Sequence, residues 1–330
     1  MIETDDTRVR VVTAAEVQRF GRPELALEAA RTAARVRRDP EADIRRMNLR
    51  LPGGWMRVLG AALPEIGVFG YKEFHYSPGG RLRYAIHLFA TDDGRPLGIV
   101  DAALITTLRT AAAATAAAAA STTDARGPLT VGVIGSGAEA EAGLRALCSA
   151  LPVGAARVSS RSEANRRGFA ERLSAELGVP VAPVATAAES ASGADIAYLA
   201  TASGGRVVAG PADLADVPLV LSIGSTMPDQ RELDGDVLAK ADCLVIDTPD
   251  VLEESGDAIE ALDRGLDPSR VRLLGDYLAG PRDPGGTTVY KSIGSPEQDL
   301  VLARDLVALL EAEEHPGRVV DSLTDVKRNL

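Results

Sequence analysis

The sequence predicts an α/β protein that combines a doubly wound parallel sheet with a second, sheet-rich α+β domain. Three observations predict this class. The chain has 330 residues, which is too long for one ordinary hydrophobic core. Short apolar segments alternate with helical segments after residue 128. A glycine-rich turn at 135–140, with the sequence GSGAEA, stands between the first of these apolar segments and a helical one.

The alternating pattern occupies the C-terminal half of the chain. Strands separated by helical segments are typical of βαβ units and of a parallel sheet. The strand candidates are LTVGVI (129–134), ARVSS (156–160), DIAYLAT (195–201), LVLSIGS (219–225), CLVID (243–247) and TTVYKSIG (287–294). A last helix, roughly Asp299 to Glu314, is expected to return to the first domain and make it discontinuous in sequence. The predicted domains are therefore 1–124 with 305–330, and 125–304.

The N-terminal third mixes helical and strand patterns. Apolar residues in Glu24–Arg38 recur at helical spacing, whereas Ile66–Tyr71 and Leu82–Ala90 have the composition of strands. The segment 91–96, with the sequence TDDGRP, follows the second strand candidate and predicts a hairpin turn. This third of the chain therefore predicts the sheet-rich domain.

An alanine-rich segment at 106–120 joins the two patterns. Alanine is the best helix former, and its small side chain lets a helix approach another backbone closely. A membrane span is disfavoured, because only about 10 consecutive residues are apolar. The segment therefore predicts a helix packed tightly at a domain junction, followed by a linker over 121–128.

Composition limits the possible functions. The net charge of −11 argues against nucleic acid or an anionic membrane as a partner. Cys148 and Cys243 stand in apolar segments and are expected to be inert, buried thiols. There are only three histidines and no Cys/His cluster, so no protein-built metal site is expected. The acidic N-terminal residues have no apolar signal segment, and a cytoplasmic protein is expected.

The glycine-rich turn predicts that a nicotinamide dinucleotide binds to a Rossmann-type domain. Gly135 permits the tight turn, Gly137 lets the backbone approach a pyrophosphate, and Ala140 permits close packing of the helix on the strand. Free N–H groups at the helix N-terminus favour the anion. A merely structural turn is the alternative. The residues assigned to the pyrophosphate are Gly135, Ser136, Gly137, Ala138 and Glu139.

The end of the second strand distinguishes NAD(H) from NADP(H). An acid at this place would bind the ribose 2′-hydroxyl. The sequence has Ser160 and Arg161 there, and no carboxylate before Glu163. A serine and an arginine can hold a 2′-phosphate, so NADP(H) is preferred over NAD(H). A solvent-exposed arginine at a helix start is the alternative.

Six segments together resemble the ornithine cyclodeaminase/mu-crystallin family over most of the chain. They are RRMNLRLPGGW (45–55), GYKEF (70–74), TLRTAAA (107–113), VIGSGAEA (133–140), IGSTMPDQREL (223–233) and VYKSIGSPEQD (289–299). The resemblance implies a Rossmann domain joined to a sheet-rich domain that forms homodimers and contributes the substrate pocket. It also implies hydride exchange at the α-carbon of an amino or imino acid.

The resemblance places a catalytic lysine at Lys72 and substrate-binding arginines at Arg46 and Arg109. An arginine binds a carboxylate through two parallel hydrogen bonds. A lysine shielded from water can have its pKa lowered toward neutrality and can exchange a proton with an imine nitrogen. These physical properties suit the implied roles.

Neighbouring residues bear on these assignments. Arg45 and Arg50 compete with Arg46 for the carboxylate-binding position. His75 follows Lys72 by three residues in a predicted strand, and this odd spacing points the two side chains to opposite faces. His75 is therefore expected to be a structural or interface residue, with a second substrate contact as the alternative.

Further cofactor contacts are implied elsewhere in the same chain, mostly in loops. The carboxyl ends of parallel strands are where ligands of doubly wound sheets bind, and the segment 291–294 matches the family segment near the nicotinamide. Ordinary loop chemistry is the alternative. The implied residues are Thr110, Thr201, Ala202, Ser203, Ser225, Lys291, Ser292 and Gly294.

Two departures from the family pattern narrow the function. Cyclodeaminases of the family carry an aspartate where this chain has Ser225, and that acid assists deamination and ring closure. Glu139 replaces the usual glutamine of the fingerprint. The predicted function is an NAD(P)H-dependent imine or ketimine reductase, or an amino-acid dehydrogenase, acting on an imino or amino acid or on an α-keto acid with an amine. The alternatives are a cyclodeaminase-type lyase with recycled NAD and a non-catalytic, mu-crystallin-like ligand-binding protein.

Overall fold

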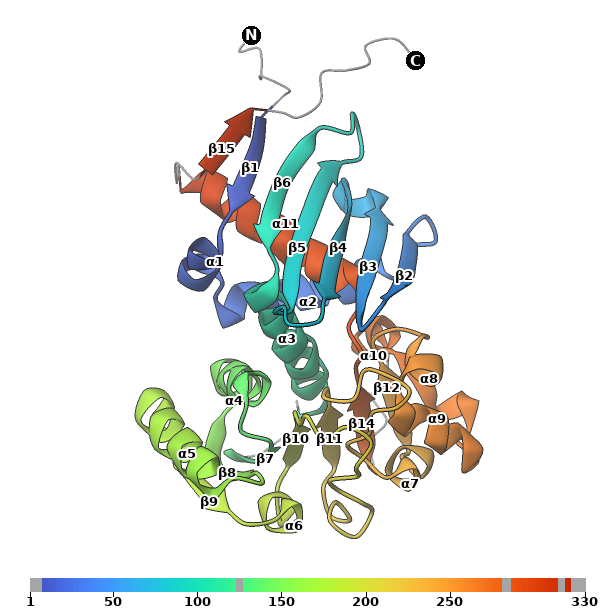
Figure 1. The fold of residues 1–330 in the computed structure, drawn as a ribbon. Coiled ribbons are helices and arrows are strands. Elements are labelled where there is room, and N and C mark those ends of the chain that lie inside the picture. Colours follow the sequence, from blue (N-terminus) through green and yellow to red (C-terminus); the bar gives the residue numbers. More distant parts are fainter. Residues whose placement is uncertain (1–7, 123–126, 281–285, 314–317, 322–330) are drawn as a thin grey trace. The chain divides into compact units, whose positions relative to one another are not determined.

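The computed structural model describes residues 8–122, 127–280, 286–313 and 318–321. The chain divides into two compact units (Figure 1). We call Met1–Arg109 with Ser295–Leu330 the terminal unit, and Thr110–Gly294 the central unit. Both boundaries fall earlier than the sequence placed them. The expected boundary at 304/305 would cut α11 (Pro296–Ala312), which is one continuous helix.

The terminal unit contains a seven-stranded sheet in the order β15-β1-β6-β5-β4-β3-β2. Each strand from β2 to β6 pairs antiparallel with the next, and the turn predicted at 91–96 joins β5 to β6. The strands are β1 (Arg8–Val12), β2 (Asp43–Leu51), β3 (Gly54–Leu63), β4 (Val68–Tyr76), β5 (Arg83–Ala90), β6 (Pro96–Asp101) and β15 (Arg318–Asp321).

Helices cover one face of this sheet. The helix α11 crosses strands β3 to β6 and also packs against α2 (Figure 1). The remaining helices of the unit are α1 (Ala14–Phe20), α2 (Pro23–Val36) and the short 3-10 helix η1 (Pro64–Ile66). Alternate residues of strands β3 to β6, such as Leu59 and Ile86, are buried on this face. On the other face Met47, Leu49 and Phe69 are 36–49% exposed.

The central unit is built on an eight-stranded sheet in the order β13-β12-β14-β11-β10-β7-β8-β9, with all pairs parallel. This confirms the predicted doubly wound parallel sheet. The strands are β7 (Leu129–Ile134), β8 (Val153–Ser159), β9 (Val181–Val184), β10 (Ile196–Leu199), β11 (Leu219–Ser222), β12 (Cys243–Ile246), β13 (Val271–Leu273) and β14 (Thr288–Lys291).

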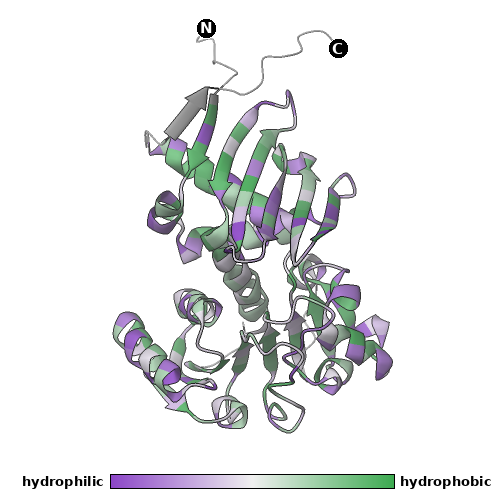
Figure 2. Cartoon of the chain, viewed as in Figure 1, coloured by the Kyte–Doolittle hydropathy of each residue, from purple (hydrophilic) through white to green (hydrophobic). Residues whose placement is uncertain are grey.

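Helices flank the central sheet, and apolar side chains fill the space between. Strands β10, β11 and β12 are buried along their whole length, and Figure 2 shows their hydrophobic character beside the mixed helices. Buried parallel strands have this composition because both faces are covered. The helices are α4 (Ala138–Ala150), α5 (Glu163–Leu177), α6 (Ala187–Ala191), α7 (Gly235–Ala239), α8 (Val251–Glu254), α9 (Gly256–Asp263), η2 (Pro268–Arg270) and α10 (Leu274–Ala279).

The alanine-rich segment forms α3 (Ala103–Ser121), which starts in the terminal unit and ends in the central unit. The predicted helix at 106–120 is therefore present and extends slightly at both ends. By length and composition α3 could cross a membrane, but 61% of its apolar stretch is buried inside the protein, as in the core helix of a globular protein. Residues 123–126 of the expected linker lie outside the described residues.

Candidate active site

The glycine-rich turn connects β7 to α4 and leaves a helix N-terminus open. Gly135 has a φ of 123°, and a Cβ there would lie 2.2 Å from the carbonyl oxygen of Ala200, so only glycine fits. Gly137 caps α4 without any side-chain hydrogen bond, and a Cβ there would meet no atom within 4 Å. Gly137 and Ala138 are exposed. The N–H groups of the first turn therefore face open space, which suits a diphosphate.

Ser159, beside this turn, provides an independent test of the fit. Its carbonyl accepts a hydrogen bond of 2.8 Å from the Gly135 N–H. Its hydroxyl is 97% buried and has no hydrogen-bond partner among the described residues. A buried hydroxyl without a partner is costly unless a ligand or water satisfies it. Ser136 and Glu139 lie half-buried in the same turn.

Basic and hydroxyl groups gather where β8 ends. Arg161 is exposed, and Arg166 donates a 3.1 Å hydrogen bond to the Ser160 carbonyl. The nearest carboxylate along the chain, Glu163, is ion-paired with Arg167 at 2.7 Å. The end of the strand therefore has cationic groups and a serine hydroxyl rather than a free acid.

The loops after β10 and β11 hold further predicted cofactor residues. Thr201 and Ser203 are half-buried and Ala202 is exposed. Ser225, in contrast, is buried, and its hydroxyl donates a 2.6 Å hydrogen bond to the Gln230 carbonyl. The Ser225 side chain is therefore engaged within its own loop.

Buried side chains of the central unit also hold the segment at the end of β14 and after it. Lys291 is completely buried and forms a 2.8 Å ion pair with Asp257. The Ser292 hydroxyl and the Gly294 N–H both donate to Asp247, at 2.6 and 2.8 Å. Lys291 and Ser292 are thus engaged in internal contacts through their side chains. Thr110, at the start of the central unit, is buried in α3.

A second functional cluster lies in the terminal unit around Asp299. Lys72, on β4, is 1% exposed, and its Nζ lies 2.7 Å from Asp299 Oδ2. Arg109, on α3, donates through Nε to Asp299 Oδ1 at 3.0 Å and through Nη1 to Gln298 Oε1 at 3.2 Å. Lys72 Nζ also donates to the Thr106 hydroxyl at 3.4 Å. One buried carboxylate therefore connects the predicted catalytic lysine to a predicted substrate arginine.

The strand register places the three competing arginines differently. Arg46 pairs with Leu59, and Leu59 pairs with Lys72, so Arg46 and Lys72 lie in one row on one face of the sheet. Arg45 points to the other face and is ion-paired with Asp43. Arg50 lies on the same face as Arg46 but four residues further along β2. Arg46 is thus the arginine placed with the cluster.

His75 lies away from the cluster. It follows Lys72 by three residues within the regular strand β4, and its cross-strand partners are Met56 and Arg83. Successive side chains of a strand alternate between faces. His75 therefore points to the face opposite Lys72, as predicted.

Burial and charge perturb the Lys72 ammonium. Burial is the largest cause and lowers the pKa of Lys72 to about 8, Asp299 opposes this by raising it, and Arg109 and Arg46 lower it further. The Phe74 ring centroid lies 5.2 Å from Nζ. Lys72 and Arg109 both pair with Asp299, and Arg46 lies near enough to Lys72 to lower its pKa. Cationic side chains gathered in this way suit an anionic ligand.

Sequence reasoning missed Asp299. It treated the residue only as the approximate start of a helix, whereas the structure places it, fully buried, in the first turn of α11. A signal was present in the sequence. A charged residue directly before the apolar run of a core helix needs a partner, and so does Arg109 within its apolar helix.

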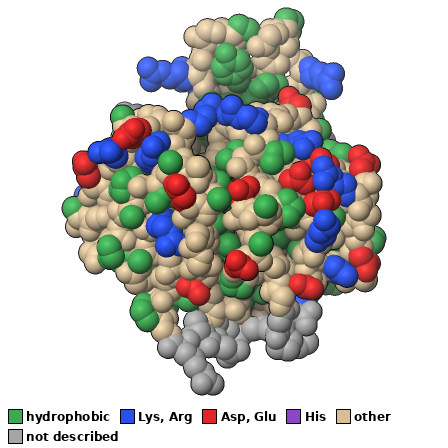
Figure 3. Space-filling view, turned by 90° about the horizontal axis from the view of Figure 1, so that it is seen from below, with side chains coloured by type: hydrophobic (Ala, Val, Ile, Leu, Met, Phe, Trp, Pro, Cys, Tyr) green, Lys and Arg blue, Asp and Glu red, His purple; other side chains and the backbone are tan. Residues whose placement is uncertain are grey.

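The described residues show no metal-binding group of three or more His, Cys, Asp and Glu side chains. Both cysteines are free thiols. Cys243 is buried, whereas Cys148 is half-buried, and burial raises the pKa of Cys148 to about 11. The face drawn in Figure 3 carries acidic and basic side chains interspersed.

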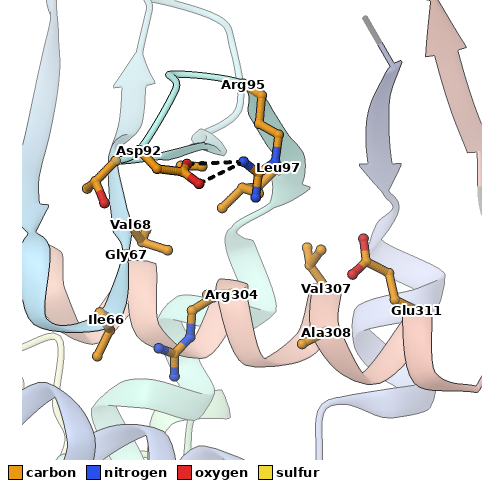
Figure 4. Close-up of a pocket in the computed structure, with 12 residues that line it drawn as sticks. Ile66, Gly67, Val68, Asp92, Arg95, Leu97, Arg304, Val307, Ala308 and Glu311 are labelled. Carbon is orange, nitrogen blue, oxygen red and sulfur yellow. Dashed lines mark hydrogen bonds and ion pairs between the residues drawn. The ribbon is translucent and has the colours of Figure 1, made fainter. Parts of the chain in front are cut away.

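An open groove of about 400 Å³ lies elsewhere in the terminal unit, between α11 and the hairpin of β5 and β6 (Figure 4). Two arginines line it, and each has an acidic partner. Arg95 pairs with Asp92 at 3.0 Å, and Arg304 pairs with Asp305 at 2.5 Å. The groove contains none of the residues of the Asp299 cluster.

The sequence matches the ornithine cyclodeaminase/mu-crystallin family over residues 76–311. It is 27% identical to the mouse ketimine reductase mu-crystallin over 67% of each chain. It is 29% identical to a Δ1-pyrroline-2-carboxylate reductase of Paracoccus denitrificans, over 80% of this chain and 86% of that one. It is also 32% identical to an L-lysine cyclodeaminase of Streptomyces rapamycinicus, over 62% of this chain and 59% of that one.

A solved structure shares the fold. The Δ1-pyrroline-2-carboxylate reductase of Thermococcus litoralis, solved with NADH and L-proline, aligns with a TM-score of 0.83 and 24% identity. The alignment covers 94% of this chain and 99% of that one. This likeness agrees with the Rossmann-type sheet described above.

Proposed function

The chain belongs to the ornithine cyclodeaminase/mu-crystallin family, and on this premise we propose that it is an NAD(P)H-dependent reductase of α-imino acids. The reverse reaction is the oxidation of the corresponding amino acid. The Lys72–Asp299–Arg109 cluster carries the proposal. It combines a buried lysine whose pKa lies near 8 with an arginine, and a second arginine, Arg46, lies nearby, in a chain that also has a dinucleotide-binding turn.

The substrate roles follow from charge and hydrogen bonding. Arg46 and Arg109 bind the α-carboxylate, because an arginine presents several donors in a fixed plane. Lys72 supplies the proton that the imine nitrogen gains on reduction and accepts it in the reverse direction. Asp299 holds Lys72 and Arg109 by one oxygen each. Its negative charge keeps the ammonium form of Lys72 available near neutral pH.

The cofactor is held by the central unit. The turn before α4, with the first residues of that helix (Gly135 to Glu139), binds the pyrophosphate, and Thr201 to Ser203 lie at the carboxyl end of β10. A bound nicotinamide supplies or accepts the hydride at the substrate α-carbon. Lys291, Ser292 and Ser225 support these loops from inside.

The cyclodeaminase alternative is disfavoured by Ser225. Its hydroxyl donates to the Gln230 carbonyl, which an ionised aspartate cannot do. A non-catalytic binding role is disfavoured by Lys72, because burying a lysine with a lowered pKa is costly and is typical of reactive sites.

The protein is proposed to form a homodimer in the cytoplasm. The face of the terminal sheet opposite α11 exposes Met47, Leu49 and Phe69, and Phe69 stacks on Phe89 at 5.2 Å. An exposed apolar sheet face of this kind favours a protein interface. Two free thiols are typical of a reducing compartment.

The reaction is tested with purified protein, NADPH or NADH, and a panel of cyclic imino acids and of α-keto acids with an amine. Nicotinamide absorbance is expected to fall with at least one substrate, and Lys72→Met is expected to slow turnover by about 10²- to 10⁴-fold. Cofactor binding without any turnover would refute the reductase. Ammonia release from a diamino acid without a net absorbance change would identify a lyase.

The pH profile tests the role of Lys72 and Asp299. Because the protonated lysine is required for reduction, kcat/KM should be level below about pH 8 and fall above it. Asp299 raises the pKa, so Asp299→Asn should move this limb to lower pH by about 1 pH unit or more. Asp305→Asn, on the same helix, should leave it in place. If kcat/KM of the Asp299→Asn variant fell at the same pH as in the unaltered protein, the proposed roles of Lys72 and Asp299 would be contradicted.

Arg161 is proposed to bind the 2′-phosphate of NADP(H). Arg161→Ala should weaken NADPH binding about tenfold and leave NADH binding unchanged. The measurement is fluorescence titration of each reduced cofactor. Arg167→Ala is the matched control, because Arg167 stands in α5, which begins just after Arg161, but is ion-paired with Glu163. Equal affinity of the unaltered protein for the two cofactors would show that NADP(H) is not preferred.

Light scattering tests the dimer. The mass should be about twice 34.4 kDa, and Phe69→Glu should reduce it to the monomer by placing a charge in the interface. Leu262→Glu, at an exposed residue of the central unit, should remain dimeric. A monomeric unaltered protein at all concentrations would rule the dimer out.

A further inference from the structure

A second group of buried charges lies under the carboxyl ends of three neighbouring strands of the central sheet. Strands β14, β11 and β10 are adjacent in that order. Glu232, Asp257 and Lys291 are each completely buried there. Burying three charged side chains is costly unless each is paired and hydrogen-bonded. The groups that these three side chains hold in place therefore indicate their role.

Glu232 connects the loop after β10 to the loop after β11. Its Oε1 accepts hydrogen bonds from the N–H and the hydroxyl of Thr201, at 2.6 and 2.8 Å. Its Oε2 accepts from the Gly224 N–H at 2.6 Å and from the Ser222 hydroxyl at 3.0 Å. A Cβ on Gly224 would lie 2.3 Å from Oε1, so the backbone approaches the carboxylate closely. The side chain of Glu232 thus fixes both loops.

Lys291 and Asp257 fix Glu232 in turn. Lys291 Nζ is ion-paired with Asp257 Oδ2 and lies 3.0 Å from the Ser222 oxygen. An ammonium only donates, so the Ser222 hydroxyl accepts from Lys291 and donates to Glu232. Asp257 Oδ1 accepts from the N–H of Glu232 and of Leu233, at 2.9 and 3.1 Å. The direction of every hydrogen bond in this network requires Glu232 to be an acceptor at both oxygens.

We propose that Glu232 is a positioning residue for the nicotinamide half of the cofactor. This inference rests on the proposed function. In a doubly wound sheet the dinucleotide spans the carboxyl edge, with its diphosphate at the turn after β7. The proposed 2′-phosphate site lies after β8, on one side of β7, and the loops held by Glu232 lie after β10 and β11, on the other. The adenosine half occupies the β8 side and the nicotinamide half occupies the β10 side.

The role predicts an effect on one half of the cofactor only. Glu232→Gln keeps the size of the side chain but replaces one oxygen with an amino group. That group would face the N–H of Gly224 or of Thr201, so a donor would meet a donor and one loop would shift. A residue that only stabilised the fold would affect both halves of the cofactor alike.

The experiment compares two ligands by isothermal titration calorimetry, namely NADP⁺ and 2′-phospho-ADP-ribose, which lacks the nicotinamide. Glu232→Gln should weaken NADP⁺ binding roughly tenfold to a hundredfold and change 2′-phospho-ADP-ribose binding less than about twofold. Asp195→Asn is the matched control. Asp195 directly precedes β10, at the amino ends of the strands, and accepts a 2.7 Å hydrogen bond from the Thr130 N–H. Its replacement should leave the affinities for both ligands unchanged.

Ser222→Ala provides a second, milder variant. It removes only the hydroxyl between Lys291 and Glu232, and it should weaken NADP⁺ binding by about threefold to tenfold while sparing the shorter ligand. If Glu232→Gln does not fold, this variant is compared in the same way. An equal loss for both ligands, or no loss for either, overturns the inference. Failure of the unaltered protein to bind NADP⁺ or NAD⁺ would instead refute the proposed function.

Discussion

The bridge from Lys72 through Asp299 to Arg109 is the interaction on which the candidate active site depends. It joins the sheet, α3 and the C-terminal helix α11 through one buried carboxylate. Two buried cations without this carboxylate would repel each other and lack compensation for their lost hydration. The bridge therefore connects residues from the N-terminal and the C-terminal parts of the chain within the terminal unit. It also keeps the pKa of Lys72 at about 8 despite complete burial.

The chain contains two buried lysine–aspartate pairs with different chemistry. Lys291 and Asp257 belong to a network whose hydrogen bonds all have fixed directions, and Lys291 supports loops. Lys72 and Asp299 have two arginines beside them, Arg109 and Arg46, which both lower the pKa of Lys72. These arginines are the groups proposed to bind a carboxylate substrate. The same type of ion pair is therefore proposed to serve positioning in one unit and proton transfer in the other.

Local patterns made much of the central unit predictable from sequence. The turn at 135–140 and the six strand candidates are short segments whose composition alone is informative. All six occur: the first has the predicted bounds, the second begins three residues earlier and ends one residue earlier, and the other four are narrower. Strand β2 was not predicted, because its residues are mostly polar and exposed. Asp299 was not predicted as a site residue, because its bond to Arg109 spans 190 residues. The choice of Arg46 over Arg45 depended on strand register, which pairing with β3 and β4 fixes.

A direct titration of Lys72 tests the central claim. The chain has four lysines, so protein labelled with ¹³C at the lysine ε-carbon gives few signals, and Lys72→Met identifies the relevant one. The account predicts that the Lys72 signal titrates near pH 8 because burial disfavours the charged amine. A titration midpoint near 10.5, as for an exposed lysine, would contradict it.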